Sequence, residues 1–204
     1  YNGAMKTPKT GLLHAALQAG RDDLKIVPMA VAYDFVLEDQ VLAHQGVKRQ
    51  QRPFARELAE MVRYGVGYQS RAFVTFGAPL PLGGYDPGSR REVMGLASRI
   101  GDRIGKLHKV LPTALVSAAM RPSIELAELT DRIDGLIEVL RSNNANLAVS
   151  TGQQALDEAI EPMIERGIVI LDGTKCRVRE RIVLRYYARS IQHLLSPRSD
   201  QATH

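Results

Sequence analysis

The spacing of apolar residues divides the chain into two parts with different periodicities. Residues 23–34 form an almost continuous apolar run, too short and too rich in β-branched residues for a helix, and predict a buried strand. A run without alternation is typical of a strand covered on both faces, so we expect it near the centre of a parallel or mixed sheet. Residues 12–20 predict a helix that leads into this strand, and residues 71–77 predict a second strand.

Pro28 interrupts the apolar run. Proline has no backbone N–H to donate to a strand ladder and is usually confined to edges, strand starts and bulges. It therefore predicts either a local break where a groove could open, or a strand that simply begins at Met29.

From Ser89 onward the apolar residues follow a helical period. Ser89 and Glu92 have the spacing of a capping box and predict a helix that runs to about residue 107. A turn at residues 172–175 between two short apolar runs predicts a β-hairpin near 167–180. Further helices are predicted at residues 54–64, 112–120, 126–141, 154–166 and 181–195. The order helix, helix, helix, hairpin is that of a winged helix-turn-helix.

Composition limits the classes of function. Of the 204 residues, 45% are hydrophobic, which is enough to build a core. The net charge of +5 suits an anionic membrane, phosphorylated small molecules or nucleic acid without selecting one. The single cysteine, Cys176, excludes an intrachain disulfide framework and a cysteine-rich metal site. No apolar run reaches the roughly 20 residues that cross a bilayer, so we expect any membrane contact to be at the surface.

Common catalytic motifs are absent from the sequence. It contains no Gly-x-Gly-x-x-Gly, Walker loop, His-Glu-x-x-His or Gly-x-Ser-x-Gly, and none of its five histidines is followed five residues later by a carboxylate. The residues alone therefore predict a scaffold without a visible catalytic pair.

Three segments together resemble the glycerol-3-phosphate acyltransferases of the bacterial membrane-bound type and their mitochondrial relatives: residues 6–13, residues 26–34 followed by Glu38, and residues 73–79. The fourth sequence block of that family is an apolar segment around a proline, followed by Tyr-Asp or Tyr-Glu. The block that supplies the catalytic His-x-x-x-x-Asp and the Glu-Gly-x-Arg-Ser of the phosphate-binding block are not in this sequence. The chain thus resembles the second half of such an enzyme.

The resemblance implies an α/β fold class. Residues 1–88 would be the C-terminal part of an acyltransferase sheet domain, and residues 89–204 a mainly helical, winged-helix-like region. The implied activity is transfer of a fatty acyl group from acyl-CoA or acyl-carrier protein to glycerol 3-phosphate, at the cytoplasmic face of the cell membrane, with no cofactor and no metal. No catalytic residue is carried over. The implied substrate-binding residues are Pro28, Tyr33, Asp34, Glu38, Lys6 and Lys9.

The last predicted helix carries a basic face. Arg181, Arg185 and Arg189 recur every four residues, so they stack along one side of the helix, with Tyr186 and Tyr187 beside them. We expect this face to meet anionic lipid headgroups, unless the arginines are ordinary solvated charges or pair with acidic residues inside the fold. A competing hypothesis makes the C-terminal region a winged helix that binds nucleic acid, or a membrane-docking module; we do not expect nucleic acid as a partner.

Overall fold

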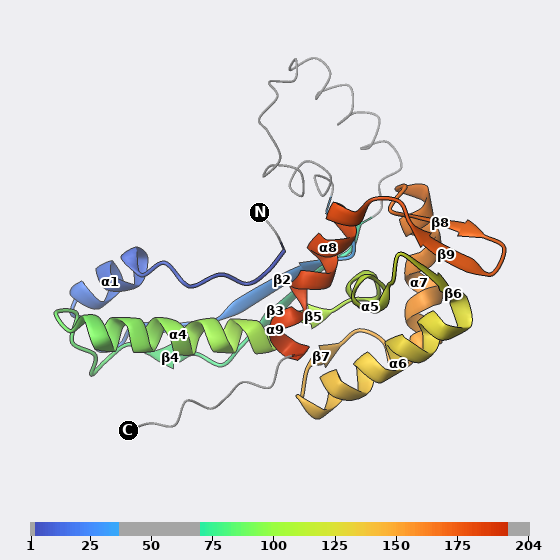
Figure 1. Cartoon of the computed structure of the whole chain (residues 1–204). Helices are drawn as coiled ribbons and strands as arrows, with labels where there is room; N and C mark the ends of the chain where they lie inside the picture. The colour runs from blue at the N-terminus through green and yellow to red at the C-terminus, as the bar shows by residue number, and fades with distance from the viewer. Residues whose placement is uncertain (1–2, 37–69, 196–204) are drawn as a thin grey trace, which may run out of the picture.

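The computed structural model describes residues 3–36 and 70–195 and has the mixed α/β composition that the sequence predicted (Figure 1). In Figure 1, α1 and α4 lie at one end of the molecule, and α6, α7 and the β8–β9 hairpin lie at the other. Glu38 and the helix predicted at residues 54–64 lie outside the described residues.

The N-terminal segment runs alongside α4 (Arg90–Leu107) and then enters α1 (Gly11–Gln18). The helix α1 also packs against α4. Gly101 and Gly105 lie one turn apart on α4. A Cβ atom on Gly101 would lie 3.8 Å from Pro8, and one on Gly105 would lie 3.3 Å from the sulfur of Met5, so the two glycines let this segment approach the helix closely. The predicted N-cap of α4 is confirmed, because the Ser89 hydroxyl accepts a hydrogen bond from the Glu92 N–H.

Two antiparallel pairs of strands follow α1. β1 (Lys25–Ile26) pairs with β4 (Leu80–Pro81), and β2 (Met29–Tyr33) pairs with β3 (Ala72–Phe76). The expectation of a doubly covered strand in a parallel or mixed sheet is therefore wrong for the described residues. Ala30 and Ala32 are buried whereas Met29 and Tyr33 are exposed, which is the alternation of a ribbon covered on one face.

Pro28 separates the two ladders. Between the paired residues Ile26 and Met29 lie two residues, whereas three residues separate their partners on the other strand, so the ribbon contains a bulge at this point. Pro28 has no N–H to donate, and its carbonyl accepts a hydrogen bond of 2.8 Å from the Gly77 N–H. The start of β2 at Met29 is confirmed, and the ladder is locally broken at Pro28, whereas a groove at this break stays a prediction.

The C-terminal part contains three longer helices, a three-stranded antiparallel sheet and a short parallel pair. The sheet has the strand order β6-β9-β8, and β5 pairs with β7. The elements are β5 (Lys109–Val110), α5 (Pro112–Ala119), β6 (Ser123–Glu125), α6 (Leu126–Ser142), β7 (Asn146–Leu147), α7 (Gly152–Glu165), β8 (Val169–Asp172), β9 (Lys175–Val178), α8 (Arg181–Ser190) and α9 (Gln192–Leu195). The predicted helices α5, α6 and α7 and the β8–β9 hairpin are confirmed.

The last helix is not continuous, contrary to the prediction of one helix over residues 181–195. It is interrupted at Ile191, where the backbone leaves the ideal helical region with φ −107° and ψ −1°. The Ser190 hydroxyl donates a 2.7 Å hydrogen bond to the Tyr187 carbonyl, which gives the backbone a local alternative to the helix ladder.

Two separate hydrophobic cores lie under these elements. The smaller one joins α1 and α4 through Leu17, Leu82, Val93 and Leu96. The larger one includes Phe35 and Val110 and the buried faces of α5, α6, α7 and α8. The division of the chain at residue 88 stays a prediction. The helix α4 packs with residues before it in the smaller core, whereas Phe35 packs in the larger core.

Candidate functional site

The outer face of the β2–β3 ribbon is apolar and exposed. The register places Met29 opposite Phe76 and Val31 opposite Val74 on this face, with Tyr33 at its end. The most exposed of these side chains, Phe76, retains 67% of its accessible surface. The bulge at Pro28 ends the β2–β3 ribbon on one side. Two of the substrate-binding residues that the resemblance implies, Pro28 and Tyr33, therefore lie at opposite ends of β2.

Asp34 is held in an ion pair where β2 ends. Its carboxylate accepts a 2.6 Å hydrogen bond from Nε of Arg71, and Arg71 also reaches Glu158 on α7 at 3.3 Å. These carboxylates raise the pKa of Arg71, with Asp34 the larger cause. Asp34 is buried and Tyr33 is half exposed. The Asp34 carboxylate therefore connects the ribbon to α7, and its predicted contact with substrate stays a prediction.

The two residues after Asp34 enter the C-terminal part of the molecule. Phe35 belongs to the larger core, and its ring meets that of Tyr187 edge to face with a centroid distance of 5.9 Å. The Val36 N–H donates to the Tyr187 hydroxyl, and Arg166 donates to the Val36 carbonyl, each at 3.0 Å. Sequence analysis missed this junction, although an aromatic residue directly after the strand was a possible signal.

Lys6 and Lys9 lie on the N-terminal segment that runs alongside α4, and both are exposed. Because α4 also packs against β2, the lysines and the ribbon residues are placed around the same helix. In the part of the chain that the structure describes, no hydrogen bond or ion pair joins Lys9 to Pro28, Tyr33 or Asp34. Glu38, the remaining predicted member of this group, is not among the described residues.

The three arginines of α8 do not lie in a single row along the helix. Arg181 and Arg185 line a pocket of about 270 Å³ together with Arg121, whereas Arg189 is half buried and does not line it. A spacing of four residues advances about 40° around a helix, so Arg189 is turned about 80° away from Arg181. None of the three forms an ion pair with an acidic residue in the described ranges, so the alternative of internal pairing is not observed there.

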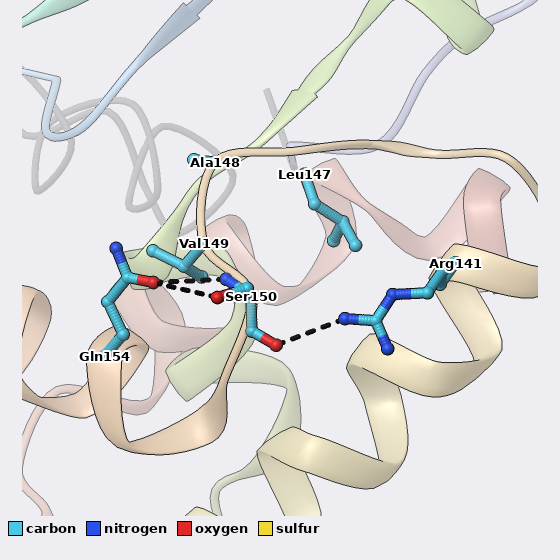
Figure 2. A pocket seen from close by; sticks show the side chains of 6 residues that line it. All are labelled: Arg141, Leu147, Ala148, Val149, Ser150 and Gln154. Atoms are coloured by element: carbon cyan, nitrogen blue, oxygen red, sulfur yellow. Dashed lines mark hydrogen bonds between the residues drawn. The ribbon is translucent and has the colours of Figure 1, made fainter.

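A larger depression of about 480 Å³ lies between α6 and α7 (Figure 2). Its polar groups bind one another: Arg141 donates to the Ser150 carbonyl at 3.2 Å, and the Ser150 N–H and hydroxyl both approach the Gln154 side-chain oxygen. Figure 2 shows these contacts between the residues that line the depression. The depression offers no acid, base or nucleophile with a perturbed pKa, so we do not assign catalysis to it.

The pKa values of His108 and Cys176 are strongly shifted. Burial, together with the charge of nearby His193, lowers the pKa of His108 to about 4. Burial raises the pKa of the Cys176 thiol to about 11, so this cysteine stays protonated and is unsuited to nucleophilic attack. Within residues 3–36 and 70–195, no three His, Cys, Asp or Glu side chains are grouped as metal ligands would be. None of the helices in these ranges has the length and apolar character that spanning a membrane requires.

Comparison with known proteins does not assign the chain to a family. No model of a known protein family matches the chain, and no curated protein is significantly similar to it in sequence. The function is therefore argued from the residues and their placement.

Proposed function

We propose that this chain is the C-terminal part of a glycerol-3-phosphate 1-O-acyltransferase, which transfers a fatty acyl group from acyl-CoA or acyl-carrier protein to glycerol 3-phosphate in phospholipid biosynthesis. In such enzymes a histidine acts as general base on the glycerol hydroxyl and an aspartate orients it. That pair is not in this sequence, so the chain contributes substrate-binding residues and a docking region.

The observation that carries this proposal is the convergence of the three family-like segments. Residues 6–13 run alongside α4 and lead into α1. The helix α4 also packs against β2, which lies within residues 26–34. Residues 73–79 include most of β3, the partner of β2. Segments that are up to 70 residues apart in the sequence are thus neighbours around one helix and one ribbon, as parts of a common substrate site would be.

The surface chemistry supports a lipid product. The strip of exposed side chains at Met29, Tyr33, Val74 and Phe76, with the half-buried Val31 between them, is an apolar surface that a fatty chain or the rest of a lipid-binding cleft would cover. Arg181 and Arg185 supply positive charge without an internal counter-ion in the described ranges. Both features favour work at the surface of an anionic membrane.

An acyl-transfer assay tests the proposal directly. The 204-residue chain, incubated with glycerol 3-phosphate and an acyl donor, should form no lysophosphatidate above a blank without protein, because it has no base to activate the hydroxyl. A longer protein that also carries a His-x-x-x-x-Asp segment upstream should form it. The matched control is that longer protein with the histidine of the motif changed to alanine. Product from the short chain, or none from the longer protein, would overturn the proposal.

Pro28 provides a finer test in the longer protein. Pro28→Ala should raise the KM for glycerol 3-phosphate or lower kcat severalfold while the protein stays folded, because the bulge that shapes the end of the ribbon loses its rigid residue. Pro87→Ala, in the turn before α4, is the matched control. Wild-type kinetics in the Pro28 variant would remove this residue from the site.

The topology of the C-terminal part favours a second role, that of a docking module. The order α5, β6, α6, β7, α7, β8, β9 with the sheet β6-β9-β8 supports a winged-helix-like arrangement, in which the short strand β7 lies between the second and third helices. In a DNA-binding winged helix the third helix enters the major groove. Here α7 exposes Asp157, Glu158, Glu161 and Glu165 and contains no lysine or arginine, so it would repel a phosphate backbone. We therefore propose docking to a membrane or to another part of the enzyme, and not nucleic-acid binding.

A further inference from the structure

The outer edge of β3 carries backbone groups that β2 does not use. The Gly77 N–H donates to the Pro28 carbonyl at 2.8 Å, so these residues are a hydrogen-bonded pair of the β2–β3 ladder. Such pairs alternate along an antiparallel ladder with pairs whose backbone groups point outward. The register therefore turns the N–H and C=O groups of three residues of β3 away from β2, namely Ala72, Val74 and Phe76. Within residues 3–36 and 70–195, no hydrogen bond reaches these groups.

This edge is not protected against pairing with another strand. In the described ranges β2 packs against α4 and β5, whereas β3 packs extensively only against β2. Proteins usually protect an open edge with a charged residue or a proline in the strand. The sequence of β3, Ala-Phe-Val-Thr-Phe, contains neither, and the side chain of Val74 at its centre is 51% exposed. The edge is therefore suited to the addition of a strand.

A second copy of β3 matches this edge residue for residue. When two β3 strands run antiparallel about a two-fold axis at Val74, this residue lies opposite Val74 of the second copy. Ala72 then lies opposite Phe76 of the second copy. All the outward-facing residues thus form hydrogen-bonded pairs, and the two members of each pair exchange two N–H···O bonds.

The charges beside β3 permit this self-pairing. The nearest charged residue in the sequence is Arg71, directly before the strand, and it would face the uncharged Gly77 of the second copy. Its guanidinium group already lies 2.6 Å from the Asp34 carboxylate and 3.3 Å from that of Glu158. No two like charges are therefore placed opposite each other along the paired strands, where they would be destabilising.

We infer that two copies of this chain pair through the free edges of β3 and form a four-stranded antiparallel sheet with the order β2-β3-β3-β2. The two-fold axis of such a pair is perpendicular to the sheet, so the exposed apolar faces of both ribbons lie on the same side. A strand of five residues spans about 17 Å. So short a contact falls below the roughly 1,200–2,000 Å² that a stable complex buries, and we expect a weak dimer that depends on concentration.

Sedimentation velocity of the 204-residue chain, from micromolar to millimolar concentration, measures this association. The inference does not depend on the acyltransferase proposal, because it concerns the chain as it stands. Val74→Lys places two ammonium groups at the two-fold axis and should weaken the dimer at least tenfold. Val139→Lys is the matched control, because this valine of α6 is 43% exposed, and its dimer should keep the affinity of the wild type within about twofold.

Val74→Pro tests the backbone pairing separately from charge. It removes an N–H that points away from β2, so the β2–β3 ladder keeps its hydrogen bonds and the dimer loses two at its centre. Circular dichroism checks that this variant is folded, and it should also weaken the dimer at least tenfold.

Disulfide trapping tests the register. Hydrogen-bonded pairs have Cα atoms about 5.5 Å apart, within the range of a disulfide. Val74→Cys should therefore form a covalent dimer in glutathione buffer, and Val139→Cys should not. A mixture of Ala72→Cys and Phe76→Cys proteins should form the mixed disulfide in preference to either symmetric one. The native Cys176 is buried and its thiol has a raised pKa, so it should not react.

Four results would overturn the inference. The first is a chain that stays monomeric over the whole concentration range. The second is equal affinity of the Val74→Lys and Val139→Lys dimers, and the third is growth into open-ended assemblies, since pairing about a two-fold axis stops at two copies. The fourth is a monomeric chain whose binding to phosphatidylglycerol vesicles is weakened by Val74→Lys, which would assign this part of the ribbon to a membrane surface.

Discussion

Asp34, Phe35 and Val36 fasten the end of β2 to the helical part by three different interactions. Asp34 forms an ion pair with Arg71, and Phe35 inserts its ring into the larger core. The backbone N–H of Val36 donates to the Tyr187 hydroxyl, and its carbonyl accepts from the Arg166 side chain. Charge, apolar contact and backbone bonding thus act on consecutive residues. Because Tyr33 directly precedes them, its position in the proposed site is determined by this junction with α7 and α8.

The fold strongly suppresses the charge of His108. It lies at the end of α4, and its ring is 5.9 Å from that of His193, which contacts the Gly105 carbonyl. Burial and the neighbouring histidine lower its pKa from 6.5 to about 4. Since the folded protein releases this proton more readily than the unfolded chain, protonation below pH 6.5 favours unfolding.

We predict that the free energy of unfolding falls by about 2 kcal/mol between pH 7 and pH 5 because of His108. This contribution is fully present above the unfolded pKa of 6.5 and is lost progressively as the pH falls toward the folded pKa of about 4. Urea unfolding at the two pH values measures it, and His108→Leu should remove most of the difference. An equal fall in wild type and variant would contradict the prediction.

At the scale of elements, α6 and α7 approach each other closely at Gly152. The Gly152 N–H donates to the Asp134 carboxylate at 2.6 Å, which caps the start of α7 from the neighbouring helix. A Cβ atom at this position would lie 2.4 Å from the Thr130 carbonyl oxygen and 3.0 Å from the Asp134 side chain. The contact with Thr130 is with backbone, so it cannot be relieved by turning a side chain.

We predict that Gly152→Ala destabilises the protein by about 1–3 kcal/mol, because α6 and α7 must move apart. Gly135→Ala is the matched control on α6, where an added Cβ atom meets nothing within 4 Å. There alanine should stabilise the helix by up to about 1 kcal/mol. Thermal or urea unfolding of both variants measures the two effects, and a loss of stability of similar size in both would refute the close approach.

Helical elements were predictable where the apolar period was long. Residues 126–141 repeat their apolar positions over four turns, and the side chains at Leu129, Ile133, Ile137 and Leu140 are buried as that period requires. The pairing of the strands was not predictable from their composition. An apolar run predicts burial of the whole strand. In β2, however, the side chains of Ala30 and Ala32 on the inner face are buried, whereas the outer face stays exposed.

The candidate site was predictable only where a residue has an unusual backbone or a regular spacing. Pro28 signalled the bulge because it lacks an N–H, and the spacing of Arg181 and Arg185 signalled a shared face of α8. Arg121, which lines a pocket with these two arginines, carried no such signal. It lies beside α8 only because α5 and α8 pack together, and a contact between residues about 60 positions apart is not encoded in either local pattern.

At the scale of the whole molecule, charge is divided between the two sides of the C-terminal part. The exposed face of α7 is acidic, whereas Arg121, Arg181 and Arg185 gather where α5 meets α8. A net charge of +5 is thus not spread evenly. An anionic membrane would attract the α8 side and repel the α7 side, so the charge distribution favours one orientation of the molecule on a membrane.

We predict that changing Arg181, Arg185 and Arg189 together to glutamine weakens binding to phosphatidylglycerol vesicles by on the order of 3 kcal/mol, roughly a hundredfold, and by less at high salt. Each basic residue near an anionic leaflet contributes about 1 kcal/mol. Arg189→Gln alone should have the smallest effect of the three single changes, because Arg189 is half buried and lies outside the pocket lined by the other two.

Vesicle sedimentation at low and high salt measures this loss, with Arg90→Gln and Arg91→Gln as the control of equal charge on α4. The control should bind vesicles nearly as well as the wild type, since α4 begins at the other end of the molecule. Unchanged binding by a folded triple variant would mean that α8 is not the membrane contact. In that case the exposed apolar strip of the β2–β3 ribbon, where Phe76 pairs with Met29 at one end, is the next surface to change.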